Sequence, residues 1–249
     1  MKFKLIFIFT LLLLATSGNK SISQNKFSKT VYQTSPISAL FNGFDNDSFT
    51  IAQIKKHGDF GLGTFNGVNG EMIILDGKVY RADYKGDISL PDNSWQSPFV
   101  TEIYFHADTS ISLKDTLSLS SLENFINKIF PSKNIICAIK IEGLFNNVKY
   151  RSEKKQTAGY KDLTEVLKHQ FTYIMNNIKG TMVGFYYPDY LKAVNAAGYH
   201  FHFISSDKKS GGHILSLMTK NIKIQIEFVK NIEIRVPSTE GFYKMNLQN

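Results

Sequence analysis

Three of the six histidines lie in one short stretch, residues 199–217, with the spacing of a metal site. His200 and His202 are two residues apart between aromatic side chains, a composition typical of a β-strand. Residues two apart on a strand point to the same face, so both imidazoles can bind one ion. A polar turn then leads to His213 on a second apolar run. A hairpin of symmetric register places His213 opposite Ile204, on the face of the other two histidines, whereas a one-residue slip would place it on the opposite face.

Three neutral nitrogen ligands without a fourth protein ligand nearby are typical of a catalytic zinc site that keeps one coordination position open. Iron, manganese and nickel also bind imidazole, so the spacing alone does not identify the ion. A single histidine more often packs or hydrogen-bonds without a metal. Together on paired strands, however, the three histidines favour metal binding.

The remaining hydrophobic patterns predict many short strands and a few helices. Apolar alternation or short apolar runs indicate strands over residues 71–75, 78–84, 99–106, 134–141, 143–151, 180–187 and 221–229. Helical spacing indicates helices over residues 49–56, from Ser120 to near Pro131, and over 162–177, the first of them capped by Asp47 and Ser48. Many strands with interspersed short helices predict an α+β fold of mixed or antiparallel sheets, not a doubly wound fold.

The composition is that of an ordinary globular protein, with 43% hydrophobic and 20% charged residues among 249. The formal net charge is +8, but residues 1–30 contain five lysines and no acid, which leaves only +3 for the other 219 residues. Apart from a short basic run at 149–155, no dense cluster of lysine and arginine with interleaved aromatics follows. Nucleic acid is therefore not an expected partner.

The N-terminus has the layout of a secretory signal peptide. Lys2 and Lys4 precede an apolar run at 5–15, and small residues follow at 15–18. The run is too short for a spanning helix, although an uncleaved anchor is the alternative, and no later segment approaches 18 consecutive apolar residues. We therefore expect a signal peptide over 1–17, a secreted or periplasmic protein without a membrane segment in its mature form, a flexible N-terminus over 18–34 and one catalytic domain over 35–249.

Cys137 is the one cysteine of the chain, so no intramolecular disulfide can form. It lies in the apolar run 135–139, which predicts a buried, inert thiol rather than a nucleophile.

Three separated segments resemble the alpha-acetolactate decarboxylase family. They are KHGDFGLGTFNGVNGEMIILDGKVY at 56–80, AIKIEGLFNNVKYRS at 138–152, and GTMVGFYYPDY at 180–190 with GYHFHFISSDKKSGGHIL at 198–215. The segments occur in the family's order and spacing, and the resemblance covers roughly residues 35–240. It implies two sheet-based subdomains with the metal site between them, commonly in a homodimer.

The same resemblance implies roles for individual residues. The zinc ligands would be His200, His202 and His213. Glu71 and Arg151 would be the catalytic charged pair, and Thr64 falls on the family's active-site threonine. The family usually has a further glutamate in its C-terminal tail. The last acidic residue here is Glu240, and whether it joins the site stays open.

The implied reaction is zinc-dependent decarboxylation of 2-acetolactate to acetoin and CO2. Loss of CO2 leaves electrons that the neighbouring ketone can accept, and a Lewis-acidic zinc would stabilise the resulting enediolate. Arg151 can pair with a carboxylate or a developing oxyanion. Glu71 could protonate the enediolate if burial raises its pKa.

Two other classes of protein share some of these features. A cupin-type metal enzyme also uses an H-x-H pair, but it should have an acidic metal ligand nearby, for which Asp207 is only a loop candidate. An exported metal-binding module without enzymatic activity could use the same three histidines. Decarboxylation with and without a chelator separates these alternatives.

Overall fold

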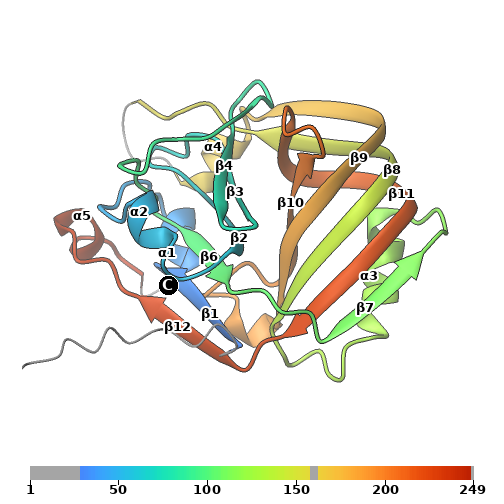
Figure 1. The fold of residues 1–249 in the computed structure, drawn as a ribbon. Helices are drawn as coiled ribbons and strands as arrows, with labels where there is room; N and C mark the ends of the chain where they lie inside the picture. Colours follow the sequence, from blue (N-terminus) through green and yellow to red (C-terminus); the bar gives the residue numbers. More distant parts are fainter. Residues whose placement is uncertain (1–28, 158–161, 248–249) are drawn as a thin grey trace, which may run out of the picture.

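The computed structural model describes residues 29–157 and 162–247, which form two β-sheets side by side with short helices around them (Figure 1). The expected signal peptide over 1–17 lies outside the described residues. The seven strands of the first sheet are, in spatial order, β12 (Asn231–Arg235), β1 (Thr30–Thr34), β6 (Val100–Ile103), β2 (Phe60–Thr64), β3 (Glu71–Leu75), β4 (Lys78–Ala82) and β5 (Ile88–Ser89). Only β12 and β1 pair in parallel; the other neighbours in this sheet are antiparallel.

The second sheet is antiparallel and built from longer strands. Its order is β10 (Gly198–Ser205), β9 (Phe171–Tyr187), β8 (Cys137–Ser152), β11 (Gly211–Phe228) and β7 (Thr109–Leu113). β10 also pairs with β11, so the sheet curls onto itself, as the curved ribbons of Figure 1 show. The predicted α+β fold with two sheet-based parts is confirmed.

Five α-helices and one 3-10 helix accompany the described strands, and α5 follows the last of them. They are α1 (Ile37–Phe41), α2 (Ile51–Ile54), α3 (Leu119–Asn127), α4 (Leu163–Leu167), α5 (Glu240–Tyr243) and the 3-10 helix η1 (Asp189–Leu191). None of the described helices is long and apolar enough to cross a membrane.

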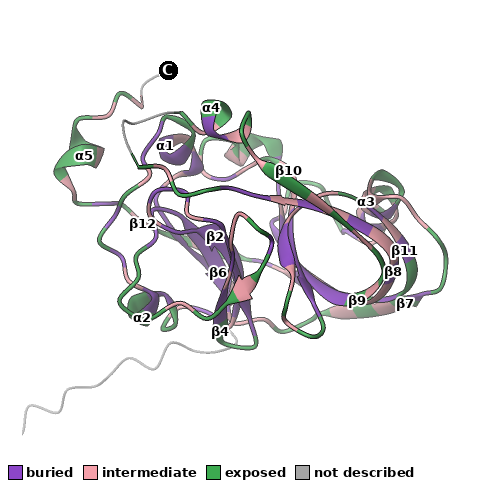
Figure 2. Ribbon diagram, turned by 90° about the horizontal axis from the view of Figure 1, so that it is seen from above, coloured by how far each residue is buried: buried purple, intermediate pink, exposed green. Residues whose placement is uncertain are grey.

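Buried side chains join the two sheets into one body. One apolar cluster contains Leu62 and Ile73 of the first sheet together with Val183 and Phe185 of the second. Figure 2 shows the buried residues concentrated in the strands, including β2 and β6, and in α1, whereas α5 is exposed. This shared core fixes the two sheets relative to each other and hence fixes residues that lie where they meet.

The helix predicted over 162–177 is wrong beyond its first turns. α4 ends at Leu167, and β9 begins at Phe171 and pairs with β8 over nearly its whole length, from Phe171 opposite Ser152 to Tyr186 opposite Cys137. The apolar spacing of this stretch is helical, but a long antiparallel ladder supplies backbone hydrogen bonds that outweigh local preference.

The two strands predicted over 134–141 and 143–151 are one strand, β8, which runs without a break through Gly143. The φ of Gly143 is +150°, and a Cβ there would lie 2.2 Å from the carbonyl oxygen of Asn221 on β11. Glycine therefore allows this φ and the close approach of β11 within the ladder. Cys137, at the start of β8, is buried as predicted, and burial raises the pKa of its thiol.

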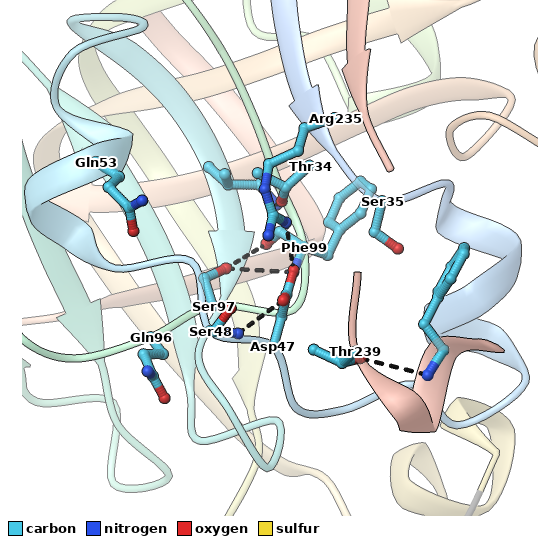
Figure 3. Close-up of polar contacts among 12 residues, drawn as sticks. Thr34, Ser35, Asp47, Ser48, Gln53, Gln96, Ser97, Phe99, Arg235 and Thr239 are labelled. Carbon is cyan, nitrogen blue, oxygen red and sulfur yellow. Dashed lines mark hydrogen bonds and ion pairs between the residues drawn. The ribbon is translucent and has the colours of Figure 1, made fainter. Parts of the chain in front are cut away.

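The predicted capping of the helix at 49–56 is also wrong. Thr50 is the N-cap of α2 and forms a capping box with Gln53, so the helix starts later than expected. Asp47 instead accepts hydrogen bonds from Arg235 Nη1 at 2.6 Å and from the Ser48 backbone N–H at 2.7 Å (Figure 3). This buried carboxylate ties β12 to the loop before α2.

The flexible N-terminus predicted over 18–34 is wrong for its last residues, and residues 18–28 lie outside the described part of the chain. Residues 30–34 form β1, which lies between β12 and β6 in the first sheet and is buried at four of its five positions. The polar composition of the segment hides this strand, because its partner β12 lies some 200 residues away in the chain and no local pattern reports the pairing.

Candidate active site

The three histidines lie on one face of the β10–β11 hairpin. His213 is directly opposite His202, not opposite Ile204, which pairs with Gly211. The predicted register is therefore wrong by two residues. A shift of two preserves the face of the sheet, so His213 still points to the side that His200 and His202 occupy.

The imidazole nitrogens have the spacing of metal ligands. Nε2 of His200 lies 3.2 Å from Nε2 of His202 and 3.1 Å from Nδ1 of His213, and the ligand atoms of all three lie within 4.8 Å of one another. Tetrahedral ligands about 2.0–2.1 Å from zinc are roughly 3.3 Å apart. The two contacts of His200 have this spacing, and the three residues can together hold one metal ion.

Burial keeps these imidazoles neutral, as metal binding requires. It lowers the pKa of His200 and of His202 to about 3, and that of His213 well below its ordinary value. Nδ1 of His202 lies 2.7 Å from the carbonyl oxygen of Met72. A proton on Nδ1 donates this hydrogen bond and leaves Nε2 with a lone pair toward the other two histidines.

A buried carboxyl group from the other sheet meets this cluster. Glu71, the first residue of β3, is 7% exposed and pairs across the ladder with Thr64 of β2. Its Oε2 lies 3.1 Å from Nε2 of His202. Burial raises the pKa of Glu71, although Arg151 and His200 act in the opposite direction. The hydroxyl of Thr64 donates to the carbonyl oxygen of Gly70 at 2.8 Å, and its oxygen stays able to accept.

Arg151 brings a positive charge to the same place. It lies on β8 directly opposite His213 of β11, so the hairpin histidine and the guanidinium share a cross-strand pair. Nη1 of Arg151 lies 3.4 Å from Oε1 of Glu71. Glu71 and Arg151 are 80 residues apart in sequence and belong to different sheets. The packing of the sheets alone brings them together.

Glu153 is a site residue that the sequence reasoning missed. It follows the end of β8, is 2% exposed, and its Oε1 contacts Nη1 of Arg151. The sequence pattern R-x-E could have indicated this contact, because residues two apart in an extended segment lie on the same face. Glu153 lies in the basic run 149–155, whose composition is typical of a solvent-exposed segment, so its sequence context indicated no role.

These groups line one cavity of about 160 Å³. Its polar wall contains Thr64, Glu71, Arg151, Glu153, His200 and His213. An apolar wall comes from α1 and α4, with Ile37, Leu40, Phe41, Leu163 and Leu167. His202 lies behind the polar wall, 1% exposed and in contact with Glu71. The cavity thus combines candidate metal ligands, the ion pair of Glu71 with Arg151 and space for a small molecule.

The sequence profile of the alpha-acetolactate decarboxylase family matches residues 31–249. The chain belongs to this family. It is 36% identical over 223 residues to alpha-acetolactate decarboxylase of Methanosarcina mazei, covering 90% of this chain and 77% of the relative. The enzyme of Bacillus subtilis strain 168 is 35% identical over 219 residues, which are 88% of this chain and 86% of that protein.

The fold agrees with this assignment to the acetolactate decarboxylase family. A crystal structure of alpha-acetolactate decarboxylase from Bacillus subtilis strain 168 superposes with a TM-score of 0.86 at 34% sequence identity, covering 88% of this chain and 94% of that one. The predicted family resemblance is confirmed, and the match begins at residue 31, within β1. The chain is an enzyme of a decarboxylase family.

The structure brings all six predicted site residues of this family member together at the junction of the sheets. Glu240 is not among the residues that line the cavity; its side chain is 81% exposed and pairs with Lys244 at 2.6 Å. Asp207 is also no ligand of the cluster, because its Oδ1 accepts from the Ser205 hydroxyl at 2.6 Å within the hairpin turn. The acidic metal ligand expected of a cupin-type site is therefore not supplied by this turn.

Proposed function

We propose that this enzyme decarboxylates 2-acetolactate to acetoin and CO2, with zinc held by His200, His202 and His213. The observation that carries the proposal is the convergence of three neutral imidazoles with Glu71 and Arg151 on one small cavity. A bound zinc ion would supply a Lewis acid that stabilises negative charge on the substrate oxygens.

Arg151 is suited to bind the substrate's carboxylate. Among the described residues that line the cavity it is the one arginine or lysine, and its guanidinium can make two parallel hydrogen bonds to a carboxylate. When Arg151 holds this carboxylate, the carbon–carbon bond to be broken lies next to the polar wall. When CO2 leaves, the neighbouring ketone accepts the electron pair and an enediolate forms.

Glu71 is suited to protonate that enediolate. Burial raises its pKa, so its carboxyl group keeps a proton more readily than an exposed glutamate does. It enters the cavity from the first sheet, whereas Arg151 and the histidines enter from the second. An acid fixed on one side delivers its proton to one face of a planar enediolate, which yields acetoin of a single handedness.

The direct test is turnover of the purified protein. 2-Acetolactate should give acetoin and CO2 in equal amounts, chelation should abolish the reaction, and added zinc should restore it. Metal-replete protein that releases no CO2 from 2-acetolactate would overturn the proposal. Bound metal without turnover would instead indicate the non-enzymatic metal-binding module.

Two further properties are proposed on the sequence and on the family resemblance. We infer export, directed by residues 1–17, from the lysines and apolar run of that segment. Mass spectrometry of protein from the periplasm or medium should then show loss of these residues. A homodimer is the expected assembly, and light scattering of the purified chain should give twice its mass.

A further inference from the structure

A second carboxylate holds Arg151 from the side of its own strand. Oε1 of Glu153 contacts the same nitrogen, Nη1, that lies 3.4 Å from Oε1 of Glu71. In the described part of the chain, the side-chain hydrogen bonds of Arg151 are both made through Nη1. Neither carboxylate contacts Nη2 or Nε, and these two nitrogens form an edge of the guanidinium that can donate two parallel hydrogen bonds to a carboxylate ligand.

The backbone around Glu153 is firmly anchored to the first sheet. The preceding residue, Ser152, is fully buried, and its hydroxyl donates to the carbonyl oxygen of Ala82 at 2.9 Å. Beyond Glu153, the backbone N–H of Gln156 donates to the carbonyl oxygen of Gly67 at 2.7 Å. Glu153 is therefore a fixed point rather than a mobile surface acid.

Burial of Glu153 costs free energy that its contacts offset only in part, which suggests a role other than stability. Glu153 is 2% exposed, and its Oε2 has no hydrogen-bond partner among the described residues. A buried carboxylate that is only partly satisfied costs free energy, and buried ion pairs are poor stabilisers compared with apolar side chains. It lies at the wall of the cavity, next to the residue that would bind substrate.

We infer that Glu153 is a positioning residue: it holds the Arg151 guanidinium at the cavity wall and prevents Arg151 from turning fully onto Glu71. Glu71 alone is a poor anchor, because its contact with Arg151 is long and its other oxygen faces His202. With Nη1 fixed by Glu153, Arg151 keeps Nη2 and Nε for the carboxylate of a 2-hydroxy acid. The inference rests on the proposed decarboxylation.

The test compares Glu153→Ala and Glu153→Gln with Glu142→Gln, an acid on the same strand that pairs with Lys140 away from the cavity. Misplacing Arg151 in Glu153→Ala should lower kcat/KM about 10- to 100-fold, mainly through a higher KM. Glu153→Gln, which keeps an oxygen acceptor of similar shape, should lose less, and Glu142→Gln should match the wild type. Calorimetry with 2-hydroxy-2-methylpropanoate, which lacks the ketone, should show the same order of weakened binding.

A double-mutant cycle with Arg151→Ala decides whether Glu153 acts through Arg151. In the Arg151→Ala background, Glu153→Ala should change kcat/KM by no more than about twofold. Full additivity, or wild-type KM and ligand binding in both Glu153 variants, would overturn the inference. If Glu153→Ala does not fold, the near-isosteric Glu153→Gln carries the comparison. Wild-type protein without decarboxylase activity would contradict the proposed function. An active wild type whose Glu153 variants keep the wild-type kcat/KM would contradict only the role of Glu153.

Discussion

Oε2 of Glu71 lies 3.1 Å from Nε2 of His202, and this contact joins the two sheets at the metal-ligand set. The carbonyl oxygen of Met72, the next residue on β3, lies 2.7 Å from the other ring nitrogen of the same histidine. One short strand of the first sheet thus orients a ligand of the second and places an acid beside it. The acid and His202 are therefore held next to each other by the same strand.

Loss of one ligand should empty the metal site. His213→Ala removes a nitrogen that lies 3.1 Å from Nε2 of His200, and two remaining imidazoles hold zinc far more weakly. We expect bound zinc and activity each to fall at least ~100-fold, a loss at the upper end of that seen for supporting residues of metal sites. Metal analysis and the acetoin assay measure this, with the exposed His169→Ala as the control. Full activity of His213→Ala without bound zinc would contradict the proposed site.

Removal of the acid should slow the reaction without loss of metal. Glu71→Gln keeps the shape of the side chain but cannot donate a proton as a carboxylic acid does. The expected fall in kcat is about 10²–10⁴-fold, the usual contribution of a general acid, with zinc content unchanged. The control is the exposed Glu165→Gln. Wild-type kcat in zinc-loaded Glu71→Gln would rule out protonation by Glu71.

Glu227 makes the stability of the fold depend on pH. Burial raises its pKa to about 7, although the backbone N–H of His106 donates to its Oε2 at 2.6 Å and acts in the opposite direction. The pKa of Glu227 is higher in the folded than in the unfolded state. Its contribution to the free energy of unfolding is therefore fully present below about pH 4.5 and is lost as the pH rises through about 7.

The measurement for Glu227 is the thermal midpoint of unfolding as a function of pH. Between about pH 5 and pH 7, the midpoint of Glu227→Gln should fall less with rising pH than that of the wild type. The exposed Glu233→Gln should follow the wild type. Identical slopes for all three proteins would show that Glu227 does not carry this dependence.

The ion pair of Asp47 with Arg235 anchors the C-terminal strand. Asp47 has a fully buried side chain, and Arg235→Ala would leave it without its cationic partner (Figure 3). The expected loss is about 2 kcal/mol in the free energy of unfolding, typical of a hydrogen bond to a charged group. Urea denaturation measures it. Lys244→Ala, which breaks the exposed pair with Glu240, should cost well under about 1 kcal/mol.

An equal effect of Arg235→Ala and Lys244→Ala would contradict the anchoring role of the buried pair. Activity at 25 °C should be unchanged in both variants, because neither residue lines the cavity.

The histidine hairpin was predictable because its signal is local. Period-two spacing and a polar turn place His200 and His202 on one face, and His213 reaches the same face in any register of the same parity. The proposed catalytic partners were not predictable from spacing. Glu71 reads locally as an exposed hairpin residue, and only the family resemblance gave it a role before the packing of the sheets showed its burial.

The errors have the same physical origin. Residues 171–177 have helical spacing, but they pair with the end of β8 and form a strand. Residues 30–34 look like a polar tail, but a parallel partner near the C-terminus makes them β1. Glu153 was missed because its contact with Arg151 depends on the direction of the Arg151 side chain, which no sequence pattern reports.

The central claim is that one zinc ion on the three histidines enables decarboxylation, and titration of the metal-free enzyme with zinc tests it most directly. Acetoin formation from 2-acetolactate should rise in proportion to added zinc and reach its plateau at one ion per chain. Undiminished activity of the metal-free protein, or no acetoin when one zinc per chain is bound, would contradict it.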